Sequence, residues 1–205
     1  MKPMSTLMIG AAVLALAAPA TAQSRGDWTL SFGIAGVMPA SDNGLLLGFI
    51  PHSVDDGISP VFTAEYFFAD NWGVELLASL PFEHDISNPG VGNIASAKLL
   101  PPTISVNYHF PTEGRFDPFL GVGLNYTKFT DVDGQGVLAA TTVDLEDTTG
   151  FALHAGFDYA LNDYSAVRFD LRYFDLESEL TVNGFSLGNT KIDPVVAAVS
   201  YVRRF

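Results

Sequence analysis

The chain ends in the stretch Asp193-Pro-Val-Val-Ala-Ala-Val-Ser-Tyr-Val-Arg-Arg-Phe205. Successive side chains of a β-strand point to opposite faces, so one face of this stretch would be apolar. The residues on this apolar face are Val195, Ala197, Val199, Tyr201 and Phe205. A strand that stops on an aromatic residue leaves an edge that would aggregate unless another strand pairs with it. A closed β-barrel supplies that partner, because its last strand pairs with its first.

The first 22 residues have the pattern of a signal peptide. Lys2 places a positive charge at the start, residues 7–18 are apolar but too short to span a bilayer, and Ala20-Thr21-Ala22 offers small residues for cleavage. The alternative, an amphipathic N-terminal helix of the folded domain, needs a polar face that residues 7–18 lack. We therefore predict a signal peptide over residues 1–22 and a β-barrel over residues 23–205.

The composition suits an exported membrane barrel. The chain has a net charge of -13 and no cysteine. The acidic balance argues against nucleic acid as a partner. Without disulfides, the exported domain must be held together by hydrogen bonds and burial, which a closed sheet provides. Hydrophobic residues make up 48% of the chain and charged ones 16%, and the apolar residues are spread over alternate positions instead of long runs.

Residues 72–82 show the clearest alternation. The side chains predicted to face lipid are Trp72, Val74, Leu76, Ala78, Leu80 and Phe82. This stripe of about 11 residues has an aromatic residue at each end, and its length is what a tilted strand needs to cross a bilayer. The alternative is a strand of a soluble β-sandwich, but sandwiches rarely keep such a stripe on every strand.

Eight segments follow this alternation: 28–38, 61–68, 72–82, 102–110, 119–129, 151–159, 165–174 and 193–205. Long connections over 39–60, 83–98, 131–149 and 177–191 alternate with short turns. Outer-membrane barrels have short periplasmic turns and long outer loops. The predicted fold is therefore all-β, an eight-stranded antiparallel up-and-down transmembrane barrel with both termini on the periplasmic side.

Several blocks carry a family resemblance. They are Tyr66–Glu75 (YFFADNWGVE), Pro81–Ile86 (PFEHDI), Lys98–Thr103 (KLLPPT), Pro118–Tyr126 (PFLGVGLNY) and the terminal strand. In this order and spacing they resemble the outer-membrane protein W (OmpW) family, from about residue 28 to Phe205. The resemblance implies a barrel in the outer membrane of a Gram-negative bacterium. It also implies a narrow hydrophobic passage that admits small apolar molecules and releases them sideways into the membrane; some relatives assist alkane uptake. The first long connection and residues 184–191 lie outside these blocks, so the ligand stays open.

Charged residues on the predicted strands must face the lumen, because a charge that faces lipid is strongly unfavourable. We predict an ion-pair network that plugs the periplasmic half of the lumen, formed by Glu65, Glu75, Asp158, Arg168, Asp170 and Arg172, with His154 beside it. Eight strands enclose an interior that side chains can fill, so no wide aqueous pore is expected. The alternative is that these charges merely satisfy one another in a polar core.

Three prolines lie where residues 72–82 and 102–110 reach the outer side. Pro81, Pro101 and Pro102 lack a backbone N–H, so the pairing between these two strands should be interrupted there. Our hypothesis is that cargo leaves the barrel through this interruption. The alternative is that the prolines simply end two strands at a loop. The resemblance also places Phe82, His84 and Leu100 at the mouth of the passage.

No catalytic residue, metal site or cofactor is predicted. The four histidines are scattered, and no pair has the spacing of metal ligands. Some eight-stranded outer-membrane barrels are hydrolases or acyltransferases, which need a nucleophile near a histidine. His52 and Ser53 are neighbours in sequence but would point to opposite sides of an extended chain, and His84-Asp85 fits loop packing at the mouth.

The expected partners are outer-membrane lipid, lipopolysaccharide, small hydrophobic ligands and the machinery that inserts barrels, which would bind the Phe205 strand. The third long connection carries Asp131, Asp133, Asp144, Glu146 and Asp147. These carboxylates could bridge divalent cations to lipopolysaccharide phosphates, or stay solvated. The expected function is a channel for small hydrophobic molecules. The alternative is a structural or cell-surface binding barrel that transports nothing.

Overall fold

The first strand of the barrel, β1 (Trp28–Met38), pairs with the last, β16 (Val195–Arg204), along its length. The register runs from Thr29 opposite Arg204 to Met38 opposite Val195. Beyond it, the N–H of Phe205 donates to the carbonyl of Trp28 at 2.8 Å. The predicted edge at the end of the chain is therefore paired, and the sheet closes on itself.

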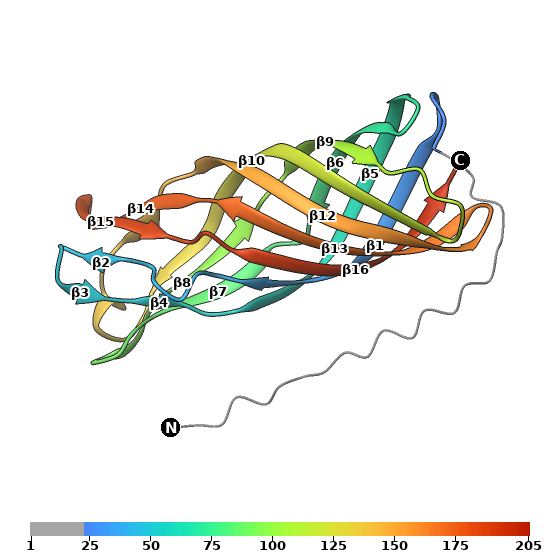
Figure 1. Cartoon of the computed structure of the whole chain (residues 1–205). Helices are drawn as coiled ribbons and strands as arrows, with labels where there is room; N and C mark the ends of the chain where they lie inside the picture. The colour runs from blue at the N-terminus through green and yellow to red at the C-terminus, as the bar shows by residue number, and fades with distance from the viewer. Residues whose placement is uncertain (1–22) are drawn as a thin grey trace.

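The computed structural model describes residues 23–205, and in this part eight strands form a closed antiparallel barrel (Figure 1). Between β1 and β16 they are β5 (Gly57–Ala69), β6 (Trp72–Ser79), β9 (Thr103–His109), β10 (Phe116–Gly134), β12 (Thr148–Asn162) and β13 (Ser165–Asp175). Each strand pairs with the next, which confirms the predicted fold class. The predicted signal peptide lies outside the described residues.

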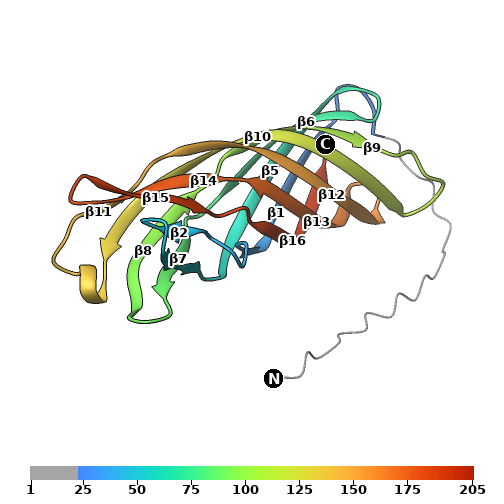
Figure 2. The same cartoon turned by 60° about the vertical axis from the view of Figure 1, so that its left-hand side comes forward.

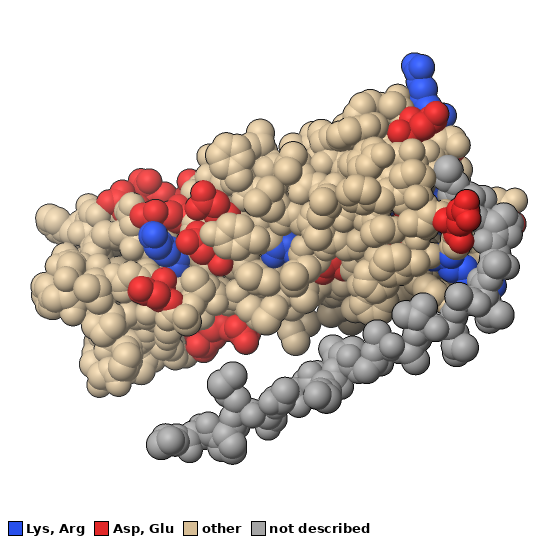
Figure 3. Space-filling view, viewed as in Figure 1, with Lys and Arg blue, Asp and Glu red and all other residues tan. Residues whose placement is uncertain are grey.

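The outer face of the barrel is apolar and its inner face is polar over much of its length. In β1, Phe32 and Ile34 are about 60% exposed on the outside, whereas Thr29 and Ser31 are buried inside. Aromatic pairs such as Trp28–Tyr66 and Trp72–Tyr108, each with ring centroids 4.9 Å apart, lie on the outside. Trp28 is beside the C-terminus, since its N–H donates to the carbonyl of Phe205 at 3.2 Å. Figure 3 shows most charged residues toward the two ends of the molecule, with a broad band between them in which only small patches of charge are visible. Hydrocarbon is the environment that fits such a band. Within residues 23–205, no helix is long and apolar enough to cross a membrane.

The long connections fold into short strands. These are β2 (Leu45–Leu46), β3 (Ile50–Pro51), β4 (Ser53–Val54), β7 (Phe82–Asn88), β8 (Gly92–Leu100), β11 (Val143–Leu145), β14 (Glu177–Val182) and β15 (Phe185–Lys191), with the 3₁₀ helix η1 (Gly136–Leu138). Segments from different connections pair with one another or with the barrel: β4 with β7, β8 with the end of β10, and β11 with β14. Figure 2 shows this extension projecting beyond the barrel on the side away from the C-terminus.

Phe82 was predicted to face lipid, and that prediction is wrong, since the side chain is only 3% exposed. Leu80 still faces outward, but β6 has already ended at Ser79 and β7 begins at Phe82. Pro81 between them cannot donate to a ladder. The alternation changes phase across Leu80 and Pro81, so Phe82 turns into the interior and pairs with Leu99 of β8.

Candidate functional site

The half of the lumen nearer the C-terminus, called the lower half, is filled by charged side chains. We call this group the ion cluster, defined as Glu65, Glu75, Asp158, Arg168, Asp170 and Arg172. Arg168 is at its centre, with Nε 2.7 Å from Asp158 Oδ1, Nη1 2.8 Å from Glu75 Oε2 and Nη2 3.2 Å from Glu65 Oε2. Arg172 Nη2 lies 2.5 Å from Glu75 Oε1 and 2.7 Å from Asp170 Oδ2. All six side chains are buried. The structure thus brings together the six residues that the sequence placed on inward positions.

Two histidines extend the ion cluster. His154, which was expected there, lies with Nδ1 3.2 Å from Asp170 Oδ2 and Nε2 2.8 Å from Asn107 Oδ1. The Asn107 amide N–H donates to Glu65 Oε1 at 2.8 Å, so its oxygen must face His154. Both ring nitrogens of His154 therefore face side-chain oxygen atoms of the cluster and its neighbour Asn107.

His109 was not predicted as part of this cluster. Its Nε2 is 3.1 Å from Glu65 Oε1, and its ring stacks on Phe119 at 5.1 Å between centroids. The alternation of β9 does place His109 on the inner face. The register that sets it against Glu65 comes from pairing across three strands, which local sequence does not encode.

A small residue makes room for this packing. A Cβ on Gly121 would collide with the His154 ring and the Asn107 amide. Gly121 leaves space in this narrow barrel at the bond between these two side chains. Because Arg168 also lies over the Phe119 ring at 4.6 Å, the lower lumen is closely packed.

One group beside the ion cluster has donor atoms close enough for a metal ion. Side-chain atoms of His109, Asp117 and Asp158 lie within 4.8 Å of one another. Arg168 already binds both oxygens of Asp158, and Arg204 lies 3.9 Å from Asp117. These guanidinium groups balance the carboxylates, which disfavours a further cation. The absence of a metal site stays a prediction.

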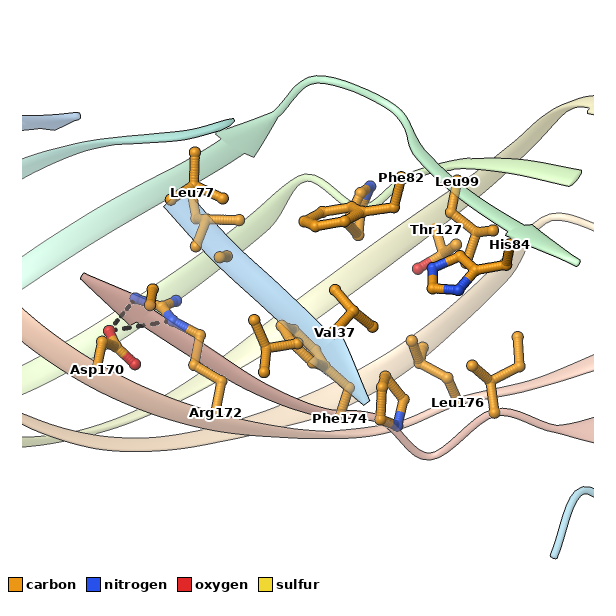
Figure 4. A pocket seen from close by; sticks show the side chains of 17 residues that line it. Val37, Leu77, Phe82, His84, Leu99, Thr127, Asp170, Arg172, Phe174 and Leu176 are labelled. Atoms are coloured by element: carbon orange, nitrogen blue, oxygen red, sulfur yellow. Dashed lines mark hydrogen bonds and ion pairs between the residues drawn. The ribbon is translucent and has the colours of Figure 1, made fainter. Parts of the chain in front are cut away.

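Above the ion cluster, the lumen becomes an apolar cavity (Figure 4). Its walls are Ala35, Val37, Val61, Leu77, Phe82, Leu99, Pro101, Phe174, Leu176, Ile192, Pro194, Val196 and Ala198, with Thr127 and His84 among them. Asp170 and Arg172 border one end, which we call the floor. The cavity is narrow, with a volume of about 40 Å³. A larger molecule can enter only if the wall side chains move.

Two of the three residues expected at the passage mouth line this cavity. Phe82 and His84 do so, but Leu100 does not, and Leu99 takes its place because it pairs with the inward-facing Phe82. His84 Nδ1 lies 2.6 Å from the carbonyl oxygen of Asp55. Burial lowers the pKa of His84 below its usual value, although Asp55 and Asp56 act in the opposite direction.

Backbone pairing in the barrel wall is interrupted beside the cavity. Pairing between β6 and β9 ends at Leu77 opposite Thr103, and pairing between β7 and β8 begins at Phe82 opposite Leu99. Residues 78–81 and 100–102 share no ladder across this stretch, which we call the seam break. Pro81, Pro101 and Pro102 all lie in it.

Each side of the seam break is held by its other neighbour. The N–H of Leu80 donates to the carbonyl of Pro60 at 3.1 Å, and the Ser59 hydroxyl donates to the carbonyl of Leu80 at 2.9 Å. On the far side, Tyr126 donates its N–H to the carbonyl of Pro102 at 3.0 Å. The interruption is therefore confined to one seam. The cavity reaches it, because Leu77, Phe82 and Pro101 belong to the cavity wall.

Comparison with known proteins gives consistent matches along nearly all of the described residues. The family model described as the OmpW family matches residues 24–205. Outer membrane protein W of Vibrio cholerae serotype O1 is 36% identical over 190 residues, which cover 87% of this chain and 88% of that protein. Outer membrane protein W of Escherichia coli K12 is 33% identical over 201 residues, 93% of each chain. The crystal structure of OprG from Pseudomonas aeruginosa superposes with a TM-score of 0.79 and 31% identity, over 90% of this chain and 98% of that one.

Proposed function

Because the chain belongs to the OmpW family of outer-membrane proteins, we propose that it passes small hydrophobic molecules across the outer membrane and releases them sideways into the bilayer. The barrel resides in the outer membrane of a Gram-negative bacterium, as its relatives do. The observation that carries the proposal is the contact between the apolar cavity and the seam break.

The ion cluster makes a straight path through the lumen unfavourable for apolar cargo. A molecule that moved downward from the cavity would have to separate Arg168 and Arg172 from the carboxylates that bind them. Breaking these buried, charge-assisted hydrogen bonds costs far more free energy than contacts with a hydrocarbon can offset. Through the seam break the same molecule meets lipid, which is as apolar as the cavity wall. Sideways exit is therefore the less costly route.

A reversible cross-link across the seam break tests this route. The chain has no cysteine, so Ser79→Cys and Pro101→Cys can be joined by a short bis-methanethiosulfonate reagent that a reductant later removes. These positions face each other if the register of Leu77 opposite Thr103 is continued. Uptake of labelled naphthalene by cells expressing the barrel should fall on cross-linking and recover on reduction.

The control joins the same strands where they are already paired, with Val74→Cys and Val106→Cys on the lipid face. That cross-link should leave uptake unchanged. If joining Ser79 to Pro101 also leaves uptake unchanged, the lateral route is wrong. If cells with and without the barrel take up naphthalene equally, the protein is a structural or cell-surface binding barrel instead.

Several accompanying assignments are part of this proposal. Residues 1–22 direct export and are removed, and the terminal strand, with Phe205 67% exposed, is read by the insertion machinery. Lipopolysaccharide surrounds the outer extension, whose exposed carboxylates include Asp133 and Asp144. The chain has no catalytic role: His52 is buried against the Thr190 hydroxyl at 3.1 Å, whereas Ser53 is exposed.

A further inference from the structure

Buried polar atoms without a partner gather at the cavity. Among residues 23–205, eight buried side-chain nitrogen or oxygen atoms have no hydrogen-bond partner. Three of them belong to cavity residues, namely His84 Nε2, Asp170 Oδ1 and Arg172 Nη1. A buried polar atom that makes no hydrogen bond is costly. Three around one cavity suggest that something else supplies the missing bonds.

The protonation state of the His84 ring follows from its contact with Asp55 and from its burial. A carbonyl oxygen only accepts hydrogen bonds, so the 2.6 Å contact with Asp55 means that Nδ1 carries the proton. The lowered pKa keeps the ring neutral, which leaves Nε2 as a bare acceptor. Gly57 helps to hold the ring, since a Cβ there would lie 2.8 Å from His84 Cε1. His84 thus presents a fixed acceptor in a wall that is apolar apart from Thr127.

The floor of the cavity offers both kinds of partner. Asp170 Oδ2 accepts from Arg172 Nε and Nη2 and from His154, but Asp170 Oδ1 accepts from none of these. Arg172 uses Nε and Nη2, which leaves the N–H groups of Nη1 free. Figure 4 shows His84 and the Asp170–Arg172 pair at opposite ends of the cavity, with apolar side chains between them.

We propose that this cavity selects small apolar molecules that carry a hydroxyl group, so that His84 is a specificity-determining residue. The hydroxyl donates to His84 Nε2 near the mouth, and at the floor it can donate to Asp170 Oδ1 or accept from Arg172 Nη1. A plain hydrocarbon leaves all three atoms unsatisfied. A carboxylate would face the lone pair of His84 and the charge of Asp170. The inference rests on the proposed function for the passage itself and names its class of cargo.

Naphthalene and 2-naphthol test this selection because they differ by one hydroxyl. Barrel-dependent uptake is measured as the initial rate in expressing cells minus the rate in cells without the barrel. We expect 2-naphthol to be favoured in the wild type. His84→Leu should lower the ratio of 2-naphthol to naphthalene uptake roughly 2- to 10-fold, the worth of one hydrogen bond. His84→Gln keeps an acceptor and should retain most of the preference.

His52→Leu is the matched control, because it removes a buried histidine of the outer extension that does not line the cavity. It should leave the ratio unchanged. If His84→Leu leaves the ratio unchanged, or lowers uptake of both compounds equally, the proposed selection is wrong. If neither compound shows barrel-dependent uptake, the proposed function fails together with the inference.

A second readout uses only the wild-type protein, in case the leucine variant fails to fold. In lipid nanodiscs with ¹⁵N-labelled histidine, the Nε2 resonance of His84 should shift when 2-naphthol is added and stay in place with naphthalene. A hydroxyl that donates to Nε2 changes the shielding of that nitrogen, whereas a contact with the apolar wall does not. An unchanged resonance with 2-naphthol would overturn the assignment of His84.

Discussion

β5, β6 and β13 contribute side chains to both halves of the lumen, yet their inward positions carry opposite chemistry in the two halves. In the lower half, Arg168 binds three carboxylates and the space around it is filled. In the upper half, apolar side chains surround a narrow cavity, and backbone pairing in the wall beside it is interrupted. Three polar atoms lack partners at the borders of this cavity, two of them on Asp170 and Arg172 at its floor. A network of charge-assisted hydrogen bonds has one favourable arrangement, whereas apolar side chains can repack at small cost. The lower half should therefore provide stability, and the upper half should provide the adaptability that passage requires.

The largest effect is expected from Arg168→Met. This change leaves Glu65, Glu75 and Asp158 buried without their shared cation, and breaking a buried ion pair in this way costs about 3–5 kcal/mol. The unfolding free energy in urea, measured in lipid vesicles, should fall by that amount. Arg25→Met, at an exposed arginine, should leave it unchanged. Equal unfolding free energies for the two variants would contradict the stabilising role of the lower half.

Filling the upper half should abolish passage with less loss of stability. Ala198 lines the cavity and Ala197 faces the bilayer, so Ala198→Phe and Ala197→Phe compare the same substitution on the two faces of β16. Ala198→Phe should reduce naphthalene uptake to that of cells without the barrel. Its cost in unfolding free energy should be about 1–3 kcal/mol, the usual range for overpacking. Normal uptake by Ala198→Phe would separate the cavity from the transport path.

Acidification should loosen the outer extension without affecting the ion cluster. Burial lowers the pKa of both His84 and His52 in the folded chain. An unfolded histidine binds its proton near pH 6.5, so the unfolded state binds more protons below that value. The stability contributed by the neutral rings is thus present above about pH 6.5 and is lost as the pH falls through it.

Amide hydrogen exchange of β7 and β8 at pH 7.5 and 5.5, corrected for intrinsic rates, measures this change. Protection should decrease at the lower pH in β7 and β8 but stay constant in β13. The decrease should be smaller in His84→Gln, which lacks the titrating ring. Equal loss of protection in β13 would mean that the two halves are not independent.

The smallest effect is expected from Asp131→Asn. Asp131 and Lys98 form an ion pair at 3.1 Å in the outer extension, but the side chain of Asp131 is 65% exposed and that of Lys98 39%. Exposed pairs of this kind contribute little because water and salt screen them. Urea unfolding should be indistinguishable from that of the wild type. A measurable loss would mean that the extension relies on charge as the lower half does.

The alternation of side chains was sufficient to predict the barrel. Residues 28–38 were expected as a strand and form β1 with those bounds. Glu65, Glu75 and Arg168 were assigned to the lumen because charge cannot face lipid, and they are buried there. This reasoning works because the membrane imposes one rule on every second position of each strand.

The features that the sequence did not predict depend on pairing between segments that are distant in the chain. Phe82 was placed on the wrong face because a single strand was continued through Pro81, where the alternation changes phase. His109 was missed because its contact with Glu65 depends on the register of several strands. The outer strands were expected as loops. They form strands only through distant pairing, and β4, for example, is defined by its pairing with β7 about 30 residues away. Short segments with no alternation of their own carry no local signal for such pairing.

The junction of β1 with β16 also sets an order of events for the cell. β16 follows β1 in the chain, so the barrel cannot close before β16 has been synthesised. A polypeptide that lacked the ten residues of β16 would bring two unpaired strand edges, with their amide and carbonyl groups, into the hydrocarbon of the membrane. A chain that ends before β16 should therefore form no smaller functional barrel, and periplasmic proteases should degrade it.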